Sequence, residues 1–356
     1  MDIRSIIATI ATTTVLMTGV PAATAQPGEN PAARMLTAQT RAPAAGRWAT
    51  LAGTSGKFRD SGRVRLLSYS LVFDASQGHY GYLREGDRFV KTRYREAPVA
   101  PGERWAVGIP DYRLFVPVRR IDLIDRKNGR THTVRMPARV TSPQWSPDGR
   151  TVLLTAYVPH SDGSLTIIGF VTVNVADRTA RLVRTGPRHR VSDWAIGRDF
   201  RFYFTGDGRG VMAMHDGTDV APDGTRIAVY DLDGALRRFY TGVGTLDGSE
   251  TVTPFSPSGR LFATFLGSSG DSGGEVGIVE AATGKVVSRF AGDIGAIAGW
   301  YDEEHLIVKR QRGRAHVYLR VDLSGAHALE LIREKLIPGP AEYKPHLGRV
   351  DFVRQG

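Results

Sequence analysis

Cysteine is absent from this 356-residue chain, and several kinds of chemistry are excluded with it. There can be no disulfide framework, no thiolate metal site, no cysteine nucleophile and no lipid attached to an N-terminal cysteine. Lysine is scarce as well: seven of the 47 basic residues are lysines, so 47 − 7 = 40 are arginines. After residue 25 no apolar run approaches the roughly 20 residues that cross a bilayer. Long helical periodicity is missing after residue 35.

The first 25 residues have the pattern of a secretory signal peptide. Arg4 precedes an apolar stretch over residues 6–20, and Ala23-Thr24-Ala25 before Gln26 forms an A-x-A cleavage site. The alternative is an N-terminal membrane anchor, but the apolar stretch is short and rich in threonine. We therefore predict a secreted or extracytoplasmic protein of 356 − 25 = 331 residues with no membrane span after cleavage. An exported chain without disulfides fits a bacterial exporter.

The composition predicts one globular domain after a short leader. Residues 26–46 are rich in alanine and proline and show no apolar alternation, so they are predicted to be a flexible leader. Residues 47–356 are then the folded domain. Hydrophobic residues make up 41% of the chain and charged residues 23%, which is ordinary for a globular protein. The 41 glycines and 19 prolines lie among alternating apolar runs, as in many short strands joined by turns.

The net charge of +11 restricts the class of partner. Nucleic acid is the usual inference from a basic chain, but export argues against it. Arginine binds carboxylate and phosphate groups bidentately, so an acidic protein or an anionic component of the cell surface is the expected partner. The alternative is that the arginine bias reflects a GC-rich coding sequence. Nothing in the sequence predicts self-association, and a monomer is expected.

A segment made of an aromatic residue, a turn and a strand recurs along the chain. Two clear copies are Trp145-Ser146-Pro147-Asp148-Gly149-Arg150 and Phe255-Ser256-Pro257-Ser258-Gly259-Arg260. Weaker copies occupy residues 192–205, with a turn expected at Ala195-Ile196-Gly197-Arg198, and residues 299–308, with a turn at Tyr301-Asp302-Glu303-Glu304. The copies are spaced by roughly 40 to 60 residues, and repeats in this range indicate propeller blades, solenoids or arrays.

A hairpin follows each of these segments, and its turn residues give the period. The expected turn positions are Gly129, Ala180, Gly234, Gly284 and Gly325. Their separations are 180 − 129 = 51, 234 − 180 = 54, 284 − 234 = 50 and 325 − 284 = 41 residues. Glycine suits such turns because it adopts positive φ at little cost. Ala180 is the exception, so its turn is expected to have another geometry.

These repeats resemble the TolB-like and WD-repeat classes of β-propeller, and degenerate copies such as residues 299–308 look like those of exported actinobacterial propeller proteins. The resemblance covers about residues 95–332 and implies that the aromatic residue lies on the innermost strand of a four-stranded blade. The turn then leads to the second strand, and the hairpin supplies the third and fourth. The resemblance indicates almost nothing about function, since propellers host many unrelated activities.

The fold class is therefore all-β, a β-propeller of four-stranded blades. Residues 47–92 contain strands like a further repeat, and residues 349–354 form a lone terminal strand without a hairpin partner. We predict that this C-terminal strand completes the blade begun after Arg47 and closes the ring. Five clear repeats and this shared one predict six blades, with seven as the alternative.

The long loops between second and third strands are the predicted binding face, because variable loops on a rigid scaffold commonly carry function. These loops span residues 158–165, 206–225, 267–275 and 310–315. The alternative is that they are tolerated insertions. The candidate ligand-binding residues on them are His160, Asp162, His215, Asp216, Asp219, Arg310, Arg312 and Arg314. His215-Asp216 and Asp219 are candidates to offer oxygen ligands to calcium, with His160 and Asp162 converging on them across the channel, although a solvated acidic loop is the simpler interpretation. The arginines are candidate contacts to an anionic partner.

Catalytic and cofactor motifs are not convincing. Gly270-Asp271-Ser272-Gly273-Gly274 matches the nucleophile segment of chymotrypsin-like proteases, but no histidine segment of that class precedes it and the fold class is wrong. The nine histidines show no zinc spacing. No catalytic residue, metal or cofactor is therefore predicted. The leading hypothesis is a non-catalytic binding or scaffold module, and the alternative is a propeller lyase, lactonase or hydrolase with its site at the channel mouth.

Overall fold

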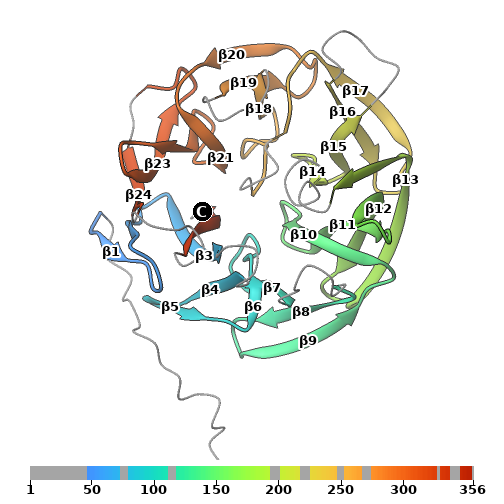
Figure 1. The fold of residues 1–356 in the computed structure, drawn as a ribbon, viewed down its shortest axis with the longest axis horizontal. Helices are drawn as coiled ribbons and strands as arrows, with labels where there is room; N and C mark the ends of the chain where they lie inside the picture. Colours follow the sequence, from blue (N-terminus) through green and yellow to red (C-terminus); the bar gives the residue numbers. More distant parts are fainter. Residues whose placement is uncertain are drawn as a thin grey trace, which may run out of the picture. The chain divides into compact units, whose positions relative to one another are not determined.

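The protein is a six-bladed β-propeller, in which six sheets surround a central axis (Figure 1). The computed structural model describes residues 46–72, 79–110, 118–192, 201–216, 225–246, 252–266, 274–326, 329–336 and 345–354. These ranges contain strands and turns and no helix, and hence no helix that could cross a membrane. The predicted fold class and the predicted number of six blades are confirmed. The signal peptide, the leader and the proposed turn at residues 195–198 lie outside the described residues.

The first three blades each contain four antiparallel strands, which are named below in order from the innermost outward. Blade 1 consists of β25 (His346–Arg354), β3 (Val64–Val72), β4 (His79–Glu85) and β5 (Arg88–Lys91). Blade 2 consists of β6 (Tyr94–Glu96), β7 (Trp105–Pro110), β8 (Arg120–Asp125) and β9 (Arg130–Arg135). Blade 3 consists of β10 (Arg139–Trp145), β11 (Thr151–Pro159), β12 (Ser164–Asn174) and β13 (Thr179–Ser192).

The other three blades vary this plan at their edges. Blade 4 consists of β14 (Tyr203–Phe204), β15 (Gly210–Asp216), β16 (Thr225–Asp231) and β17 (Leu236–Thr241). Blade 5 has β18 (Leu261–Leu266), β19 (Glu275–Glu280) and β20 (Val286–Phe290), and Thr245 and Phe255 pair with β18 through single bridges on its inner side. Blade 6 has β21 (Ile294–Trp300), β22 (His305–Gln311), β23 (Ala315–Asp322) and β24 (Leu329–Lys335), followed outside by β2 (Lys57–Phe58) and β1 (Ala49–Thr50).

The aromatic residue of the repeat joins neighbouring blades. Trp145 ends β10, and its Nε1 donates a hydrogen bond of 3.0 Å to the backbone oxygen of Pro98 in blade 2. Trp300 ends β21, and its Nε1 donates one of 2.6 Å to the oxygen of Pro254 in blade 5. A buried indole N–H needs an acceptor, and each time the preceding blade supplies it. The prediction that these aromatic residues lie on innermost strands is confirmed.

The turn after the aromatic residue is held by its own side chains. In blade 3, Asp148 Oδ1 accepts hydrogen bonds from Ser146 Oγ at 2.6 Å and from the backbone N of Arg150 at 3.0 Å. The Ser146 hydroxyl in turn accepts the backbone N–H of Thr151, the first residue of β11. Side chains of this kind mimic the backbone bonds of a turn. The motif therefore fixes the exit angle from the innermost strand to the second.

In blade 4 the same turn lies ten residues after the predicted one. Thr205 and Asp207 reproduce the bonds of Ser146 and Asp148: Asp207 Oδ1 accepts Thr205 Oγ1 at 2.6 Å and the backbone N of Arg209 at 3.0 Å. The predicted loop over residues 206–225 is consequently wrong. It begins with this turn and contains strand β15, which pairs with both β14 and β16.

The third-to-fourth hairpin turns share a left-handed residue at the expected period, with one shift. Gly129, Gly234, Gly284 and Gly325 have φ values of 69° to 91°, as predicted. In blade 3 the corresponding residue is Arg178, with φ of 56°, and not Ala180. The left-handed position of that turn is therefore two residues earlier than expected and is occupied by an arginine. Asn174, the last residue of β12, stabilises it by accepting the backbone N–H groups of residues 176 and 177.

Both chain ends take part in closing the ring. The C-terminal strand β25 pairs with β3 and becomes the innermost strand of blade 1, as predicted. The N-terminal hairpin of β1 and β2 pairs instead with β24, so it extends the outer edge of blade 6. Blade 1 therefore begins at Val64, later than the position near Arg47 that the sequence suggested. The two chain ends therefore meet at the boundary of blades 6 and 1, with β25 on its inner side and β1 and β2 on its outer side.

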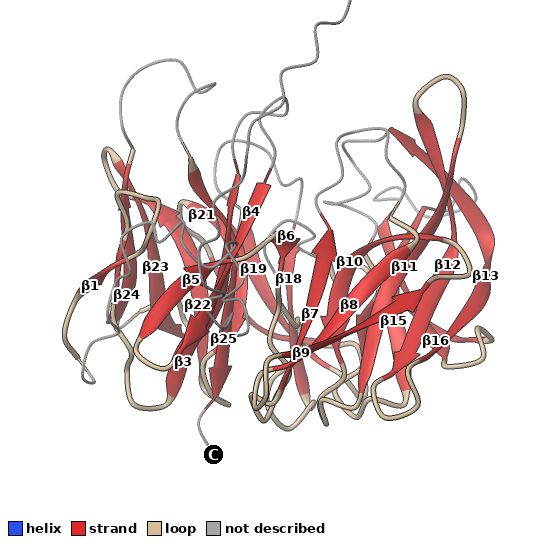
Figure 2. Ribbon diagram, turned by 90° about the horizontal axis from the view of Figure 1, so that it is seen from below, coloured by secondary structure: helices blue, strands red, loops and turns tan. Residues whose placement is uncertain are grey.

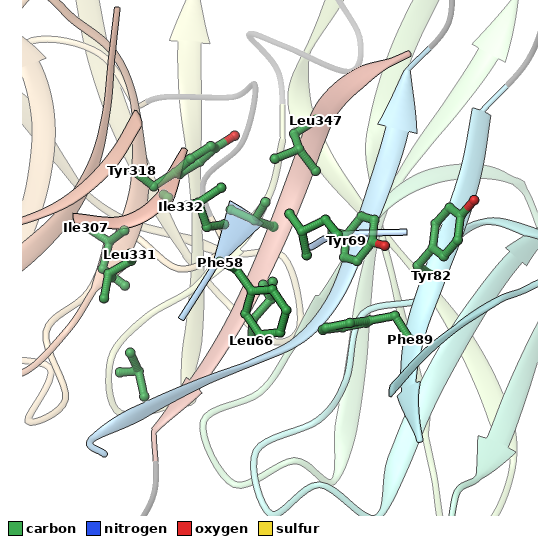
Figure 3. Close-up of a cluster of buried hydrophobic side chains, with 14 of the residues drawn as sticks. Phe58, Leu66, Tyr69, Tyr82, Phe89, Ile307, Tyr318, Leu331, Ile332 and Leu347 are labelled. Carbon is green, nitrogen blue, oxygen red and sulfur yellow. The ribbon is translucent and has the colours of Figure 1, made fainter. Parts of the chain in front are cut away.

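A buried hydrophobic cluster fills this boundary (Figure 3). It combines Phe58 of β2 and Leu347 of β25 with residues of β3, β4, β5 and the three strands β22 to β24. Tyr69 and Tyr82 stack with their ring centroids 4.9 Å apart, and Tyr69 Oη donates a hydrogen bond to the oxygen of Ala52. Burial raises the pKa of Tyr69, so this phenol stays neutral. Apolar burial of this kind is the main favourable contribution to folding.

A buried ion-pair network holds β25 near the axis. The side chain of Arg349 is 3% exposed, and its Nε donates to Asp351 Oδ1 at 2.8 Å. Its Nη1 donates to the oxygen of Pro143 at 2.6 Å and lies 3.8 Å from Glu96 Oε2. Ser68 of β3 donates to the other oxygen of Asp351 at 2.7 Å. One guanidinium thus connects blade 1 to the innermost strands of blades 2 and 3.

We predict that Arg349→Ala lowers the free energy of unfolding by about 3–5 kcal/mol, because it leaves the buried carboxylate of Asp351 without its cation. Arg63→Ala is the control: Arg63 is 73% exposed, and its pair with Asp302 at 3.2 Å contributes about 0–1 kcal/mol. Urea unfolding followed by tryptophan fluorescence measures both. Equal losses in the two variants would contradict a special role for the buried network.

The turn carboxylates also predict acid sensitivity. Burial acts to raise the pKa of Asp148, Asp207 and Asp302, but hydrogen bonds within the turns outweigh it and lower each pKa from its ordinary 3.8. Because the folded pKa values lie below the unfolded ones, this stabilisation is present above about pH 4 and is lost as the pH falls through the folded values. Asp148→Asn should therefore flatten the dependence of unfolding free energy on pH below about 4. An unchanged slope would refute this assignment.

Candidate functional site

The two faces of the propeller differ in their connections. The turns from first to second strands and from third to fourth strands gather on one face, where β25 ends (Figure 2). We call this the turn face. The connections from second to third strands and the links between blades lie on the opposite face, which we call the loop face. Its described second-to-third connections are residues 160–163 in blade 3 and 312–314 in blade 6.

Three arginines crowd the connection of blade 6 on the loop face. Arg310 lies near the end of β22, and Arg312 and Arg314 lie in the turn that leads to β23. This turn is tight, because the backbone of Arg312 and Ala315 exchanges hydrogen bonds of 2.8 and 3.1 Å. The side chains of Arg312 and Arg314 are exposed and make no hydrogen bond or ion pair to a described residue.

Arg310 is held in place beside this pair. Its Nη2 donates a hydrogen bond of 3.4 Å to the oxygen of Gly325, and its guanidinium packs over Gly292 in the link from blade 5. Burial lowers the pKa of Arg310, and the like charge of Arg312 lowers it further, while Asp293 acts in the opposite direction. A nearby anion would relieve this crowding of like charges. Of the predicted residues, these three form a coherent group.

His160 and Asp162 are engaged in the connection of blade 3. Asp162 Oδ1 accepts the backbone N–H of Ser164 at 3.0 Å and its hydroxyl at 2.6 Å. The Nε2 of His160 lies 2.6 Å from Thr166 Oγ1. Both side chains therefore stabilise the turn that begins β12. Blades 3 and 6 are opposite one another in the ring, so this pair does not converge with the arginines (Figure 1).

The remaining predicted residues do not form a loop site. His215 lies on β15 and is 8% exposed; its ring packs against Phe239 of β17, with centroids 4.9 Å apart. Asp216 is the last residue of the same strand. Their placement in a loop was wrong because β15 continues through them. Asp219 lies outside the described residues, as does most of the segment at residues 270–274. Among the described residues no group of three or more histidines and carboxylates is close enough to hold a metal ion.

Sequence patterns did not reveal the polar centre of the ring. Arg349, Asp351 and Glu96 meet there from two blades, and Gln144 of β10 is 2% exposed beside them. A strand alternating charged and apolar residues, as at residues 349–354, was the available signal. Arg349 pairs with Asp351, but Arg349 Nη2 and Gln144 Nε2 have no hydrogen-bond partner among the described residues. The ion pair and the bond to Pro143 give this centre a structural role, with these two buried donors left unpaired.

No protein-family model matches the chain, and no curated protein matches it. Similar solved structures include TolB from Acinetobacter baumannii, with 17% identity, a TM-score of 0.48 and coverage of 83% of this chain and 68% of that one. An oligogalacturonate lyase in complex with manganese is similar with 10% identity, a TM-score of 0.48 and coverage of 80% of this chain and 94% of that one. Kuenenia stuttgartiensis hydrazine synthase is similar with 12% identity, a TM-score of 0.43 and coverage of 66% of this chain and 64% of that one. The chain spans less than two thirds of the hydrazine synthase chain. At these identities the likeness concerns the fold alone.

We predict that Asp162→Ala lowers the free energy of unfolding by about 1 kcal/mol, since two hydrogen bonds to Ser164 are lost at an exposed turn. Thermal unfolding of the variant and the parent, each with and without added Ca²⁺, measures this. If Asp162 were instead a calcium ligand, Ca²⁺ would stabilise the parent and not the variant.

Proposed function

We propose that this chain is an exported binding module that docks an acidic protein or an anionic cell-surface component on its loop face. The observation that carries the proposal is the arginine group of blade 6, formed by the half-buried Arg310 and the exposed Arg312 and Arg314. Its charge has no carboxylate partner among the described side chains at Arg312 and Arg314. Export is proposed from the signal-peptide pattern of residues 1–25.

Rigidity supports this role. The tight turn at Arg312 and Ala315 is flanked by β22 and β23, which pair over seven residues from His305 to Gln311. Side chains on such a scaffold lose less freedom on binding than those on a mobile segment, which favours recognition. Guanidinium groups also bind carboxylate and phosphate in a fixed fork geometry. A binding role without catalysis needs nothing beyond this surface.

The test compares capture of partners by the protein and by Arg312→Glu/Arg314→Glu. The tagged protein is crosslinked on its own cells, and captured proteins and polymers are identified by mass spectrometry. We expect a partner whose binding weakens about tenfold in the variant and decreases steeply with salt, since the Debye length falls from about 10 Å at 0.1 M to about 3 Å at 1 M.

Arg119→Glu/Arg120→Glu is the matched control. These two exposed arginines are in blade 2, at the start of β8, and their reversal changes the net charge by the same amount. Capture that survives reversal at blade 6, or that both double variants reduce equally, would contradict docking at this arginine group.

A further inference from the structure

A cleft of about 440 Å³ opens on the turn face between blades 4 and 5. Its floor includes the turns around Gly206 and Gly259, which are packed so closely that a Cβ on Gly206 would lie 2.2 Å from the Gly259 Cα. Its walls include the two hairpin turns that end β16 and β19. The volume lies in the range of sites for small molecules. The arginine group of blade 6 is on the other face.

The cleft is open because blade 5 has two small residues at its hairpin turn. Ala281 and Ala282 line it, whereas the hairpin of blade 4 has Leu232 and Asp233 at the corresponding positions. At the boundary of blades 3 and 4, Asp233 pairs with Arg181 at 2.7 Å, and the oxygen of Leu232 accepts from the same guanidinium. At the next boundary, between blades 4 and 5, Ala281 and Ala282 provide neither the bulk of Leu232 nor the charge of Asp233.

The corresponding arginine of blade 4, Arg238, therefore has no carboxylate partner at the boundary with blade 5. Arg238 of β17 donates to the backbone oxygens of Ala281 at 2.8 Å and Ala282 at 3.1 Å, both of which are neutral. Its guanidinium lies 4.5 Å from the ring centroid of Tyr240, and the Tyr240 hydroxyl donates to the same Ala281 oxygen. These contacts fix the guanidinium on the cleft wall without neutralising it.

The other charged groups of the cleft leave a positive excess. Asp231 pairs with Arg237, and its Oδ1 accepts two backbone N–H groups of its own turn. Asp207 is bonded within its turn to Thr205 and to the backbone N of Arg209. The side chain of Arg209 hydrogen-bonds no described residue. Among the described residues no carboxylate hydrogen-bonds to Arg209 or Arg238, although the charge of Arg209 helps to lower the pKa of Asp207. The three arginines and two aspartates of the lining leave one positive charge in excess.

We propose that this cleft binds a small organic anion, with a carboxylate or phosphate group held by Arg209 and Arg238. The apolar part of the ligand lies against Phe255, Tyr230 and Ala281, which also line the cleft. Guanidinium groups bind both kinds of anion bidentately. The site is separate from the proposed docking surface and does not depend on it.

Benzoate and phenyl phosphate are suitable probes, with benzyl alcohol as the neutral control. Binding to the full chain is measured by ligand-observed NMR and by calorimetry. The decisive variant is Ala282→Asp, which supplies Arg238 with the carboxylate that Asp233 gives to Arg181. It should weaken anion binding about tenfold, since a charged hydrogen bond is lost. Ala282→Asn has the same shape without the charge and should bind nearly as well as the parent.

Each outcome decides the proposal. Binding of phenyl phosphate alone identifies a phosphate site, binding of benzoate alone a carboxylate site, and binding of both a general anion site. A similar loss in Arg209→Gln, with Arg312→Glu/Arg314→Glu unaffected, would support the proposed location. The proposal is overturned if neither anion binds better than benzyl alcohol, or if Ala282→Asp and Ala282→Asn weaken binding equally. Unfolding curves of the Ala282 variants confirm that both remain folded.

Discussion

Ring closure is the constraint on which this structure depends, and the C-terminal strand β25 provides it. A propeller is stable only when its first and last blades bury their facing sides against each other. Here β25 enters blade 1 from the end of the chain, while β1 and β2 extend blade 6 from its beginning. Arg349 holds the same strand on its other side, because its guanidinium donates a hydrogen bond to Pro143 in blade 3. Closure thus couples residues more than 200 positions apart.

The turn face is the rigid base of the ring, because contacts cross every boundary between neighbouring blades there. Some are backbone contacts at glycine and proline, and others are ion pairs or hydrogen bonds. From blade 1 onward the contacts join Arg65 to Glu103, Pro101 to Gly149, Pro147 to Gly208, Gly206 to Gly259, Ser258 to Glu303, and Asp302 to Arg63. Glycine is needed where two turns meet, because a side chain would collide with the neighbouring backbone. The repeated motif therefore specifies the packing of blades as well as the turn itself.

Sequence patterns predicted the architecture because the turns that follow the innermost strands of blades 3 to 6 are all held by hydrogen bonds of their own side chains. Ser146 and Asp148 are recognisable in the sequence, and so is the hairpin glycine at most boundaries. The turn of blade 4 was predicted wrongly because Thr205 and Asp207 replace the serine-proline pattern while making the same bonds. The pairing of β2 with β24 joins residues over 270 positions apart, and no local pattern indicates such a contact. For the candidate site, the arginines of blade 6 were found because they are close in sequence.

The cleft between blades 4 and 5 was beyond prediction, since it arises from side chains that one repeat lacks. Its position can be understood only when Ala281 and Ala282 are superposed on Leu232 and Asp233 of the neighbouring hairpin. Arg181 pairs with the carboxylate of Asp233 at the boundary of blades 3 and 4. Its counterpart Arg238 donates only to backbone oxygens at the boundary of blades 4 and 5. The two blades remain joined beneath the cleft by the turn contacts of Gly206 and Gly259. In a repeat protein, departures from the repeat are therefore the places to seek binding sites.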